Sequence, residues 1–386
     1  MRGAEAVLAC LREQDVDTVF GYPGGMILPL YDALYGQTEI RQILVTHEQN
    51  AAHAADGYAR ATGRVGVCIA TSGPGATNLV TGIATAYMDS IPMVAITGQV
   101  DLEMLGRDAF QETDILDVTM PVTKHNYKIK NAADLVPTIR EAFALARSGR
   151  PGPVLIDVPR NLFFEEVAYT EQKREERRPG KPDADFAICA AEAAAEIVNA
   201  ERPLVIVGGG VISAGASAQT IAFIEKYKLP VVHTLMGMGG IPSTHPQMLG
   251  FIGMHGAKTA NYAVGAADLV IALGSRFADR QTGNLSKFTA NRKFIHIDID
   301  PAEIDKIVGS SIGLAGDMCV ILNLLMRQAP KSDYAAWWQQ LHTWQEEFAY
   351  DYHSDALSVP WALNQVARMT AGKAYAYATD VGQHQM

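Results

Sequence analysis

Short apolar runs alternate with helical patterns along two long stretches of the chain, and this alternation limits the folds open to it. In the first stretch the apolar runs are residues 18–20, 43–45, 65–70, 93–97 and 154–158. In the second they are residues 204–207, 231–234, 269–273 and 294–299. Helical patterns such as 76–88 and 132–147 separate them. The alternation predicts an α/β fold with doubly wound parallel sheets and helices on both faces, whose ligands bind at the carboxyl ends of the strands.

Changes in composition divide the chain further. Residues 1–165 form the first predicted domain, a charged and proline-containing linker covers 166–185, and the second domain covers 186–328. A second linker, 329–355, includes a tryptophan-bearing helical stretch at 334–350. Residues 356–386 then resemble the start of a third α/β domain, with one helix and a strand at 374–379. About 30 residues cannot close a core alone, so we expect this domain to be incomplete.

Charge and cysteine content narrow the class of protein. The 386 residues carry a net charge of −10, which argues against nucleic acid or an anionic membrane as the main partner. The four cysteines are far apart in sequence and form no CxxC pair, as is usual in a reducing compartment. No apolar run approaches the ~20 residues that span a bilayer, and the N-terminus has no secretion signal. We expect a cytoplasmic protein.

One carboxylate opens a helix with an unusually small face. Glu48 follows an apolar run, and the positions at helical spacing from it are Ala52, Ala55 and Ala59. An acid in the first turn of a helix can simply be stabilised by the helix dipole or cap the helix end. It can also be a functional carboxylate at the end of a strand. The helix pattern alone leaves both interpretations open.

Glycine-rich turns follow strands in both stretches. TSGPGATN, residues 71–78, is suited to a ligand approaching the backbone, but is equally a tight turn. Gly208-x-Gly210 matches half of a dinucleotide fingerprint whose third position is Ser213. Asp298, Asp300, Arg276 and Arg280 end or follow later strands and could contact ribose, phosphate or carboxylate groups. Together these strand ends favour a nucleotide site in the second domain. DAFQE, residues 108–112, is a polar loop with one phenylalanine that is more often surface or core than substrate wall.

Several motifs together resemble one family. FGYPGG, HEQNAAHAADGYARATG, TSGPGATNL, DSIPMVAITGQV, DAFQE, KHN, SGRPGPVLIDVP, MHG, GSRFADR, HIDIDPAEI and DVGQHQM resemble the catalytic large subunit of acetohydroxyacid (acetolactate) synthase along the whole chain. The resemblance implies a thiamine-diphosphate pyrimidine domain at 1–165, a central FAD-binding Rossmann-like domain at 186–328, and the start of the diphosphate and Mg²⁺ domain at 356–386. It implies the first common step of branched-chain amino acid (isoleucine and valine) biosynthesis.

The resemblance also assigns roles to residues. Glu48 would hydrogen-bond N1′ of the cofactor's aminopyrimidine and favour the imino form that deprotonates the thiazolium C2. Pyruvate would then lose CO2, and the remaining two-carbon carbanion would attack a second 2-oxo acid, pyruvate or 2-oxobutyrate. Gly25 would lie near the reacting centre, Phe110 and Gln111 in a substrate pocket across a dimer interface, and Arg276 on the second substrate's carboxylate. The small alanine face would let helix and cofactor pack closely.

The cofactor contacts implied by the family form two groups. Val381, Gly382, Gln383 and His384 match a loop that touches the diphosphate. FAD, which takes no redox part, would contact Arg150, Gly208, Gly209, Gly210, Thr234, Leu235, Met236, Met254, His255, Gly274, Ser275, Arg276, Asp279, Arg280, Asp298 and Asp317. The expected partners are a second copy of the chain, as a homodimer or tetramer, and a small regulatory subunit.

Three departures from the family pattern stand out. Arg160 and Asn161 replace a lysine and an aspartate, which changes side-chain reach and hydration. Ala278 replaces a carboxylate in GSRFADR, which puts one FAD contact in doubt. The family's Gly-Asp-Gly…Asn segment, which binds Mg²⁺ and the diphosphate, has no counterpart here. We therefore expect a truncated chain without its metal site that binds FAD weakly or not at all and does not catalyse alone.

Other functions are weighed against this one. The missing metal segment would suit a non-catalytic flavin-binding or interaction module that pairs with a full-length relative. A 2-oxo acid decarboxylase or pyruvate oxidase shares the thiamine motifs, but DAFQE with SGRPGPV speaks against both. Glu48 excludes the glyoxylate carboligases, which lack this acid. A nicotinamide dehydrogenase is disfavoured by the imperfect fingerprint and by the lack of a clear acid–base pair.

Overall fold

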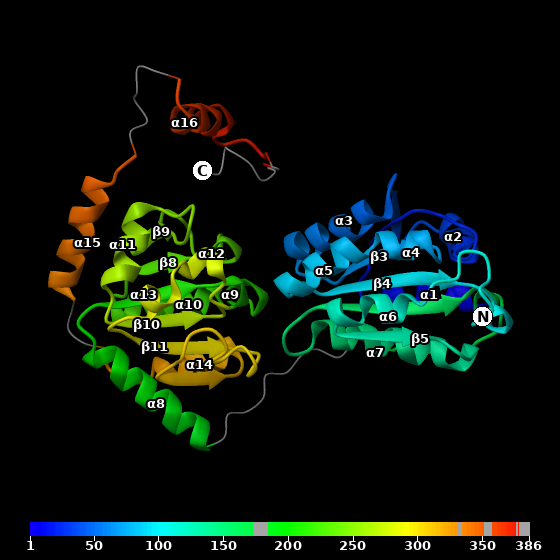
Figure 1. The fold of residues 1–386 in the computed structure, drawn as a ribbon, viewed down its shortest axis with the longest axis horizontal. Coiled ribbons are helices and arrows are strands. Elements are labelled where there is room, and N and C mark those ends of the chain that lie inside the picture. The colour runs from blue at the N-terminus through cyan, green and yellow to red at the C-terminus, as the bar shows by residue number, and fades with distance from the viewer. Residues whose placement is uncertain (173–183, 331–333, 351–356, 376, 378–386) are drawn as a thin grey trace. The chain divides into compact units, whose positions relative to one another are not determined.

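Two compact units, Met1–Arg178 and Pro179–Met386, make up the chain. The computed structural model describes residues 1–172, 184–330, 334–350, 357–375 and 377 (Figure 1). Each unit contains one six-stranded sheet, and every named strand pairs in parallel with its neighbours. Within the described residues, no helix is both long and apolar enough to cross a membrane.

The sheet of the first unit has the order β2-β1-β3-β4-β6-β5. Its central strands β3, β4 and β6 are buried along their whole length, as expected when helices cover both faces. The strands are β1 (Thr18–Gly21), β2 (Arg41–Leu44), β3 (Gly66–Ala70), β4 (Met93–Gln99), β5 (His125–Lys128) and β6 (Pro153–Pro159).

Two separate apolar clusters line the two faces of this sheet. On one face the strands pack against α1 (Gly3–Glu13), α2 (Leu28–Tyr35) and α7 (Leu135–Arg147). On the other they pack against α3 (Glu48–Thr62), α4 (Pro74–Asn78), α5 (Val80–Asp89) and α6 (Ile115–Thr119). Neighbouring residues of β3 divide between the clusters, Ile69 in the first and Cys68 in the second, because successive side chains alternate across a strand. In the described part of this unit, 3-10 turns lie at Leu102–Met104, Met120–Val122, Ala132–Asp134 and Arg160–Phe163.

The alanine face of α3 is a packing surface within the chain. Ala52 and Ala55 are fully buried in the second cluster. A methyl group on Gly82 of α5 would lie 2.4 Å from Cβ of Ala52, and one on Gly66 of β3 would lie 2.1 Å from the carbonyl oxygen of Ala55. Figure 1 shows α3 and α5 side by side. The small side chains therefore allow α5 and β3 to pack closely against α3. This packing replaces the interpretation that the alanines make room for a cofactor.

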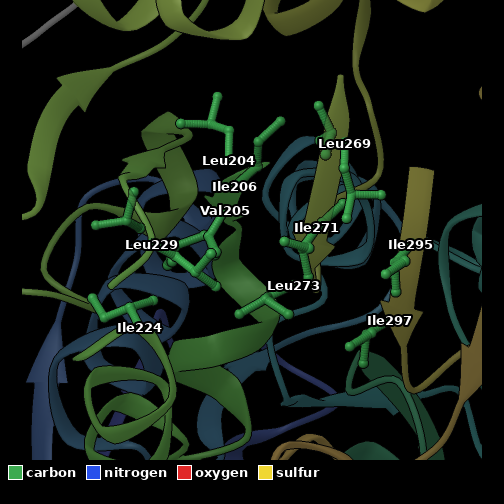
Figure 2. Packing of buried hydrophobic residues seen from close by; sticks show 14 of the residues in the cluster. Leu204, Val205, Ile206, Ile224, Leu229, Leu269, Ile271, Leu273, Ile295 and Ile297 are labelled. Carbon is green, nitrogen blue, oxygen red and sulfur yellow. The ribbon is translucent and has the colours of Figure 1, made fainter. Parts of the chain in front are cut away.

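The sheet of the second unit has the order β12-β11-β10-β7-β8-β9 around one large apolar cluster. Figure 2 shows aliphatic side chains of β7, β10 and β11 packed together with Ile224 and Leu229. The strands are β7 (Pro203–Val207), β8 (Val231–His233), β9 (Met248–Phe251), β10 (Leu269–Leu273), β11 (Lys293–Asp298) and β12 (Ile312–Ala315). The helices are α8 (Ala184–Asn199), α9 (Gly209–Ser213), α10 (Ser217–Tyr227), α11 (Lys258–Ala266), α12 (Asp279–Thr282), α13 (Leu285–Thr289), α14 (Met318–Leu325), α15 (Ala335–Glu347) and α16 (Val359–Thr370), with a 3-10 turn at Leu235–Gly237.

Helix α15 belongs to the core of the second unit, although the sequence pattern indicated a linker over 329–355. Trp337 is 3% exposed, and its Nε1 donates to the carbonyl oxygen of Pro203 at 3.1 Å. The hydroxyl of Tyr334 donates to the carbonyl oxygen of Ile197 at 2.8 Å. Leu341 is fully buried. This helix therefore fastens the end of α8 to the start of β7.

The α/β class and the parallel sheets are confirmed, and the structure differs from the sequence prediction at a few elements. Strands β5, β9 and β12 were missed, and all three lie at sheet edges. Edge strands are covered less completely than central ones and need no continuous apolar run. The helix predicted at 76–88 is two helices that meet at Leu79. The strand predicted at 374–379 is wrong at its described residues, 374, 375 and 377, and its remainder lies outside the described part.

Candidate functional site

Glu48 begins α3 at the carboxyl end of the first sheet and is 8% exposed. His47 caps the helix by accepting from the backbone N–H of Gln49 at 3.1 Å, so the glutamate is not needed as the cap. Its Oε2 accepts from Nδ2 of Asn78 at 2.9 Å. A methyl group on Gly75 would lie 3.3 Å from Oε1, so this oxygen faces the TSGPGATN turn. One oxygen of the buried Glu48 carboxylate is thus fixed by a hydrogen bond, and the other faces the turn.

Thr71 brings the FGYPGG segment against the same turn. Its hydroxyl accepts from the backbone N–H of Met26 at 3.2 Å. Methyl groups on Gly24 and Gly75 would lie 2.5 and 2.7 Å from its Cγ2, so both glycines are required by close packing. A methyl group on Gly25 would meet nothing within 4 Å. The predicted substrate residue Gly25 therefore borders open space next to the turn that faces Glu48.

The DAFQE loop packs on the other side of this turn. A methyl group on Gly73 would lie 2.6 Å from the carbonyl oxygen of Gln111, and Gly73 has a φ of +57°. Phe110 is 82% exposed. The Glu112 carboxylate accepts from the backbone N–H groups of Gly106 and of Ala109, the latter at 3.0 Å, and these bonds lower the pKa of Glu112. The predicted residues Glu48, Gly25 and Gln111 therefore border one glycine turn.

A buried carboxyl group lies at the base of that loop. Asp157 of β6 is fully buried, accepting from Oγ1 of Thr97 at 2.7 Å and from Nε2 of Gln99 at 3.0 Å. Burial raises the pKa of Asp157 to about 7, although both hydrogen bonds lower it. The group therefore titrates near neutral pH within a fixed network.

Two family motifs, KHN and SGRPGPV, join each other in the fold. Nζ of Lys124 donates to the carbonyl oxygens of Leu145 and Ser148 at 2.6 and 2.7 Å and so closes the end of α7. A methyl group on Gly152 would lie 2.9 Å from Cγ of Lys124. Arg150, a predicted FAD contact, donates from Nε to Oγ of Ser90 at 2.8 Å in the first unit. These motifs have a structural explanation of their own.

The other predicted FAD residues gather at one edge of the second sheet. They follow the ends of β7, β8, β9, β10, β11 and β12, and parallel strands place all these ends together. The two glycine turns contact each other, because the N–H of Gly210 donates to the carbonyl oxygen of Gly274 at 3.1 Å. A methyl group on Gly208 would lie 2.1 Å from that same oxygen. The packing of the chain therefore requires these glycines whether or not a ligand is present.

Buried polar side chains surround Ser275 at this edge. His296 is 1% exposed, its Nε2 donates to the carbonyl oxygen of Ser275 at 3.0 Å, and burial lowers its pKa. Oγ of Ser275 donates to Oε1 of Gln281 at 3.1 Å. Within the described residues, Nε2 of Gln281 and Nδ1 of His296 are buried without a partner. Unpaired buried donors and acceptors are costly, and they fit a polar ligand at this edge.

The remaining FAD positions differ in environment. Asp317 caps α14, accepting from the backbone N–H groups of Cys319 and Val320 at 3.0 and 3.2 Å. Asp298 is 7% exposed and accepts from the N–H of Asp300 at 3.0 Å. Thr234 accepts from the N–H of Gly237 at 3.1 Å. Leu235, Met254, His255, Asp279 and Arg280 are exposed, Arg276 is half-buried, and Met236 lies against Gly209, where an added methyl would stand 3.1 Å from its Cβ.

Other predictions meet the limits of the described residues. Val381, Gly382, Gln383 and His384 all lie outside them. The described part of the chain contains no cluster of three or more His, Cys, Asp or Glu side chains placed to hold a metal ion. Ala278 occupies the N-cap position of α12 without a side-chain cap, which is a place where an aspartate would be favoured.

Sequence reasoning missed Asn78, Gln99 and Asp157. Asn78 was quoted only as the end of the TSGPGATN motif, and its distance of 30 residues from Glu48 conceals the hydrogen bond. Asp157 interrupts an apolar strand, and a lone acid in a run that predicts a central strand is a signal that could have been used.

Comparison with known proteins matches a domain family to each of the two units. The thiamine pyrophosphate enzyme N-terminal TPP binding domain matches residues 1–118, and the thiamine pyrophosphate enzyme central domain matches residues 190–325. The acetolactate synthase large subunit of Haemophilus influenzae is 44% identical over 397 residues, covering 100% of this chain and 69% of the relative. The chain belongs to the acetolactate synthase large-subunit family.

Two further acetolactate synthases support this membership. The isozyme 3 large subunit of Escherichia coli is 44% identical over 398 residues, covering 100% of this chain and 69% of its own length. The probable large subunit of Methanocaldococcus jannaschii is 50% identical over 330 residues, covering 84% of this chain and 56% of its own length. The chain thus spans between 56% and 69% of the length of these three acetolactate synthase large subunits.

Proposed function

We propose that this chain carries the pyrimidine-binding and central domains of an acetolactate synthase. The reaction would decarboxylate pyruvate and condense its two-carbon unit with a second 2-oxo acid, giving 2-acetolactate or 2-aceto-2-hydroxybutyrate. The observation that supports this most is the arrangement of Glu48, Asn78 and the glycine turn at 71–78, which we call the Glu48 corner. There the buried carboxylate is fixed by Asn78 and lies beside the glycines of the turn. Membership of the acetolactate synthase family supports a catalytic role for these residues.

The residues of the corner suit thiamine diphosphate. When bound, this cofactor supplies the electron sink that a 2-oxo acid needs in order to lose CO2. Glu48 would share a proton with N1′ of the aminopyrimidine through Oε1, because Oε2 is occupied by Asn78. Ser72 is 1% exposed, and its Oγ has no partner among the described residues, which leaves a buried hydrogen-bonding group in the turn for a ligand. Val381, Gly382, Gln383 and His384 remain the proposed contacts to the diphosphate.

Substrate binding would use residues around the same turn. The open space next to Gly25 would admit the reacting 2-oxo acid. Phe110, exposed in the DAFQE loop, would provide an apolar wall, and Gln111 a polar contact. Arg276 belongs to the second unit, and its proposed role, pairing with the carboxylate of the second substrate, pyruvate or 2-oxobutyrate, rests on the family resemblance and on the general pairing of guanidinium groups with carboxylates.

FAD would bind at the carboxyl edge of the second sheet without a redox role. Nε2 of Gln281, which has no hydrogen-bond partner among the residues that the structure describes, and the buried Asp298 are suited to a polar ligand there. Mg²⁺, which would supply positive charge to the diphosphate, needs oxygen ligands, and the described residues contain no carboxylate cluster placed to hold it. The proposed domains are 1–165, 186–328 and 356–386, with the central domain extended beyond 328 by α15, which packs into its core, and with the structural division between Arg178 and Pro179. We further propose a cytoplasmic homodimer or tetramer with a small regulatory subunit.

The test is the substitution Glu48→Gln in the protein purified from its own cells. We expect acetolactate formation to fall at least about 100-fold, since general acid–base groups typically contribute that much, with FAD content unchanged. Glu39→Gln, at an exposed carboxylate of the same unit, is the matched control and should keep full activity. Parallel loss of FAD and activity would mean that Glu48 is structural. A wild-type protein that holds FAD but forms no acetolactate would favour the non-catalytic flavin-binding module.

A further inference from the structure

Gln99 joins the two ends of the loop that carries Phe110 and Gln111. It is the last residue of β4 and is 1% exposed. Its Oε1 accepts from the backbone N–H of Val100 at 2.9 Å, where the loop leaves the strand. Its Nε2 donates to the carbonyl oxygen of Thr113 at 3.0 Å, where the loop returns to α6. One side-chain amide therefore closes the base of the loop.

Asp157 fixes that amide in place. Its Oδ2 accepts the second N–H of Gln99 at 3.0 Å, and its Oδ1 accepts from Oγ1 of Thr97 at 2.7 Å. All three side chains are 1% exposed or less. Since Gln99 then uses both donors and its acceptor, it cannot turn without leaving a buried polar group unpaired, which costs free energy.

We call these hydrogen bonds of Gln99 and Asp157 the clasp of the loop. The loop needs it because part of its own backbone is strained. Asp108 and Gln111 have positive φ values of +52° and +58°, a region that residues other than glycine rarely adopt. Residues in this region persist only where the surrounding structure holds them. A second bond, from the N–H of Leu102 to Oδ1 of Asn161 at 3.0 Å, ties the start of the loop to the residue two positions beyond β6.

We propose that Asp157 is a positioning residue for substrate binding, which acts through Gln99 to close the base of the 100–114 loop and so sets where Phe110 and Gln111 stand. The link from the loop to the substrate rests on the function proposed above, whereas the clasp itself does not. We assign no chemistry to Asp157, whose carboxylate hydrogen-bonds to Thr97 and Gln99 within the described part of the chain.

Four variants separate this role from a general structural one. Asp157→Leu and Gln99→Met keep the approximate volume and remove the hydrogen bonds of the clasp. Asp157→Asn is the conservative variant, because its amide oxygen can face Gln99 while its Nδ2 donates to the hydroxyl of Thr97. Thr97→Val is the matched control, because it removes the other partner of Asp157 and leaves Gln99 untouched.

Hydrogen exchange of the loop amides, read by mass spectrometry on the full chain, tests the clasp without any turnover. We expect peptides covering 101–113 to exchange about tenfold faster in Asp157→Leu and in Gln99→Met, with no further gain in the double variant. Peptides from α1 and α7 should be unchanged and report intact folding. Asp157→Asn and Thr97→Val should exchange as the wild type does. Unchanged loop exchange in the two disruptive variants, or an equal increase in Thr97→Val, would overturn the proposal.

Steady-state kinetics then tests the link to substrate. For the variants with a loosened loop we expect KM for the 2-oxo acid to rise about tenfold while kcat changes less, as when a binding contact is misplaced. A loosened loop with unchanged KM and kcat would overturn the positioning role. If the protein purified from its own cells forms no acetolactate, the proposed function fails, while the exchange data still decide whether the clasp exists.

Discussion

Gly82→Ala is expected to destabilise the first unit by placing a methyl group too close to α3. The added methyl would lie 2.4 Å from Cβ of Ala52, whereas carbon atoms in contact prefer about 3.5–4.0 Å. Helices α3 and α5 would have to separate by about 1 Å, and overpacking of this kind costs about 1–3 kcal/mol. Replacing glycine by alanine within a helix returns about 1 kcal/mol. The net loss is therefore up to about 2 kcal/mol.

Gly57→Ala separates the clash from the helix preference. Gly57 lies in α3, is exposed, and has nothing within 4 Å of an added methyl. It should stabilise the unit by about 0.5–1 kcal/mol. Because both substitutions gain the same preference, the difference between the two variants isolates the clash at about 1–3 kcal/mol.

The assay is urea denaturation. Unfolding is monitored by hydrogen exchange or proteolysis of peptides from the first unit, so that the second unit does not contribute to the signal. Adding Ala52→Gly to Gly82→Ala removes the shortest contact of the new methyl, so the double variant should be more stable than the sum of the single changes by about 1 kcal/mol or more. If Gly82→Ala proves as stable as Gly57→Ala, the helices have room to spare and the close-packing explanation is wrong.

The remaining predictions concern a helix cap, a buried acid and an open glycine. Asp317→Ala removes both cap bonds of α14 and should lower the free energy of unfolding of the second unit by about 1 kcal/mol, measured by urea denaturation. Folding raises the pKa of Asp157 from 3.8 to about 7, so the native state holds the proton more tightly and stability falls as pH rises from about 4 to 7. The loss should reach at most about 4 kcal/mol, level off above pH 7, and be absent in Asp157→Asn, as urea titrations across this range would reveal. Gly25→Ala should leave the stability of the first unit within about 0.5 kcal/mol, since its methyl meets nothing, while raising KM for the 2-oxo acid; an equal loss of stability would contradict the open space.

The sequence allowed the layered α/β fold to be predicted because the central strands are buried on both faces and are therefore apolar throughout. The edge strands β5, β9 and β12 were not predicted, for the converse reason. β5, with the sequence HNYK, pairs on one side and keeps polar, half-exposed side chains. Helix α15 appeared polar because only Trp337 and Leu341 of its residues are buried.

The candidate site was predictable only in part. Glu48 stood out by its position at the head of a helix after a strand. Its partner Asn78 and the Asp157–Gln99 pair depend on hydrogen bonds between residues 30 and 58 positions apart, which no local pattern encodes. The alanine face of α3 was noticed, but its explanation needed Gly82 and Gly66, which lie on two other elements.

Helix α15 has a consequence for the order in which the protein is made. Trp337 and Leu341 complete a core whose first strand, β7, begins at Pro203, so more than a hundred residues are synthesised between the two surfaces. Until residues 334–341 have left the ribosome, the carbonyl oxygens of Ile197 and Pro203 lack their partners and part of the core is open to water. The first unit carries all of its core within Met1–Arg178 and can fold as it emerges. A nascent chain halted before residue 334 would therefore hold a finished first unit beside an unfinished second one, and this is the interval in which chaperones would be needed.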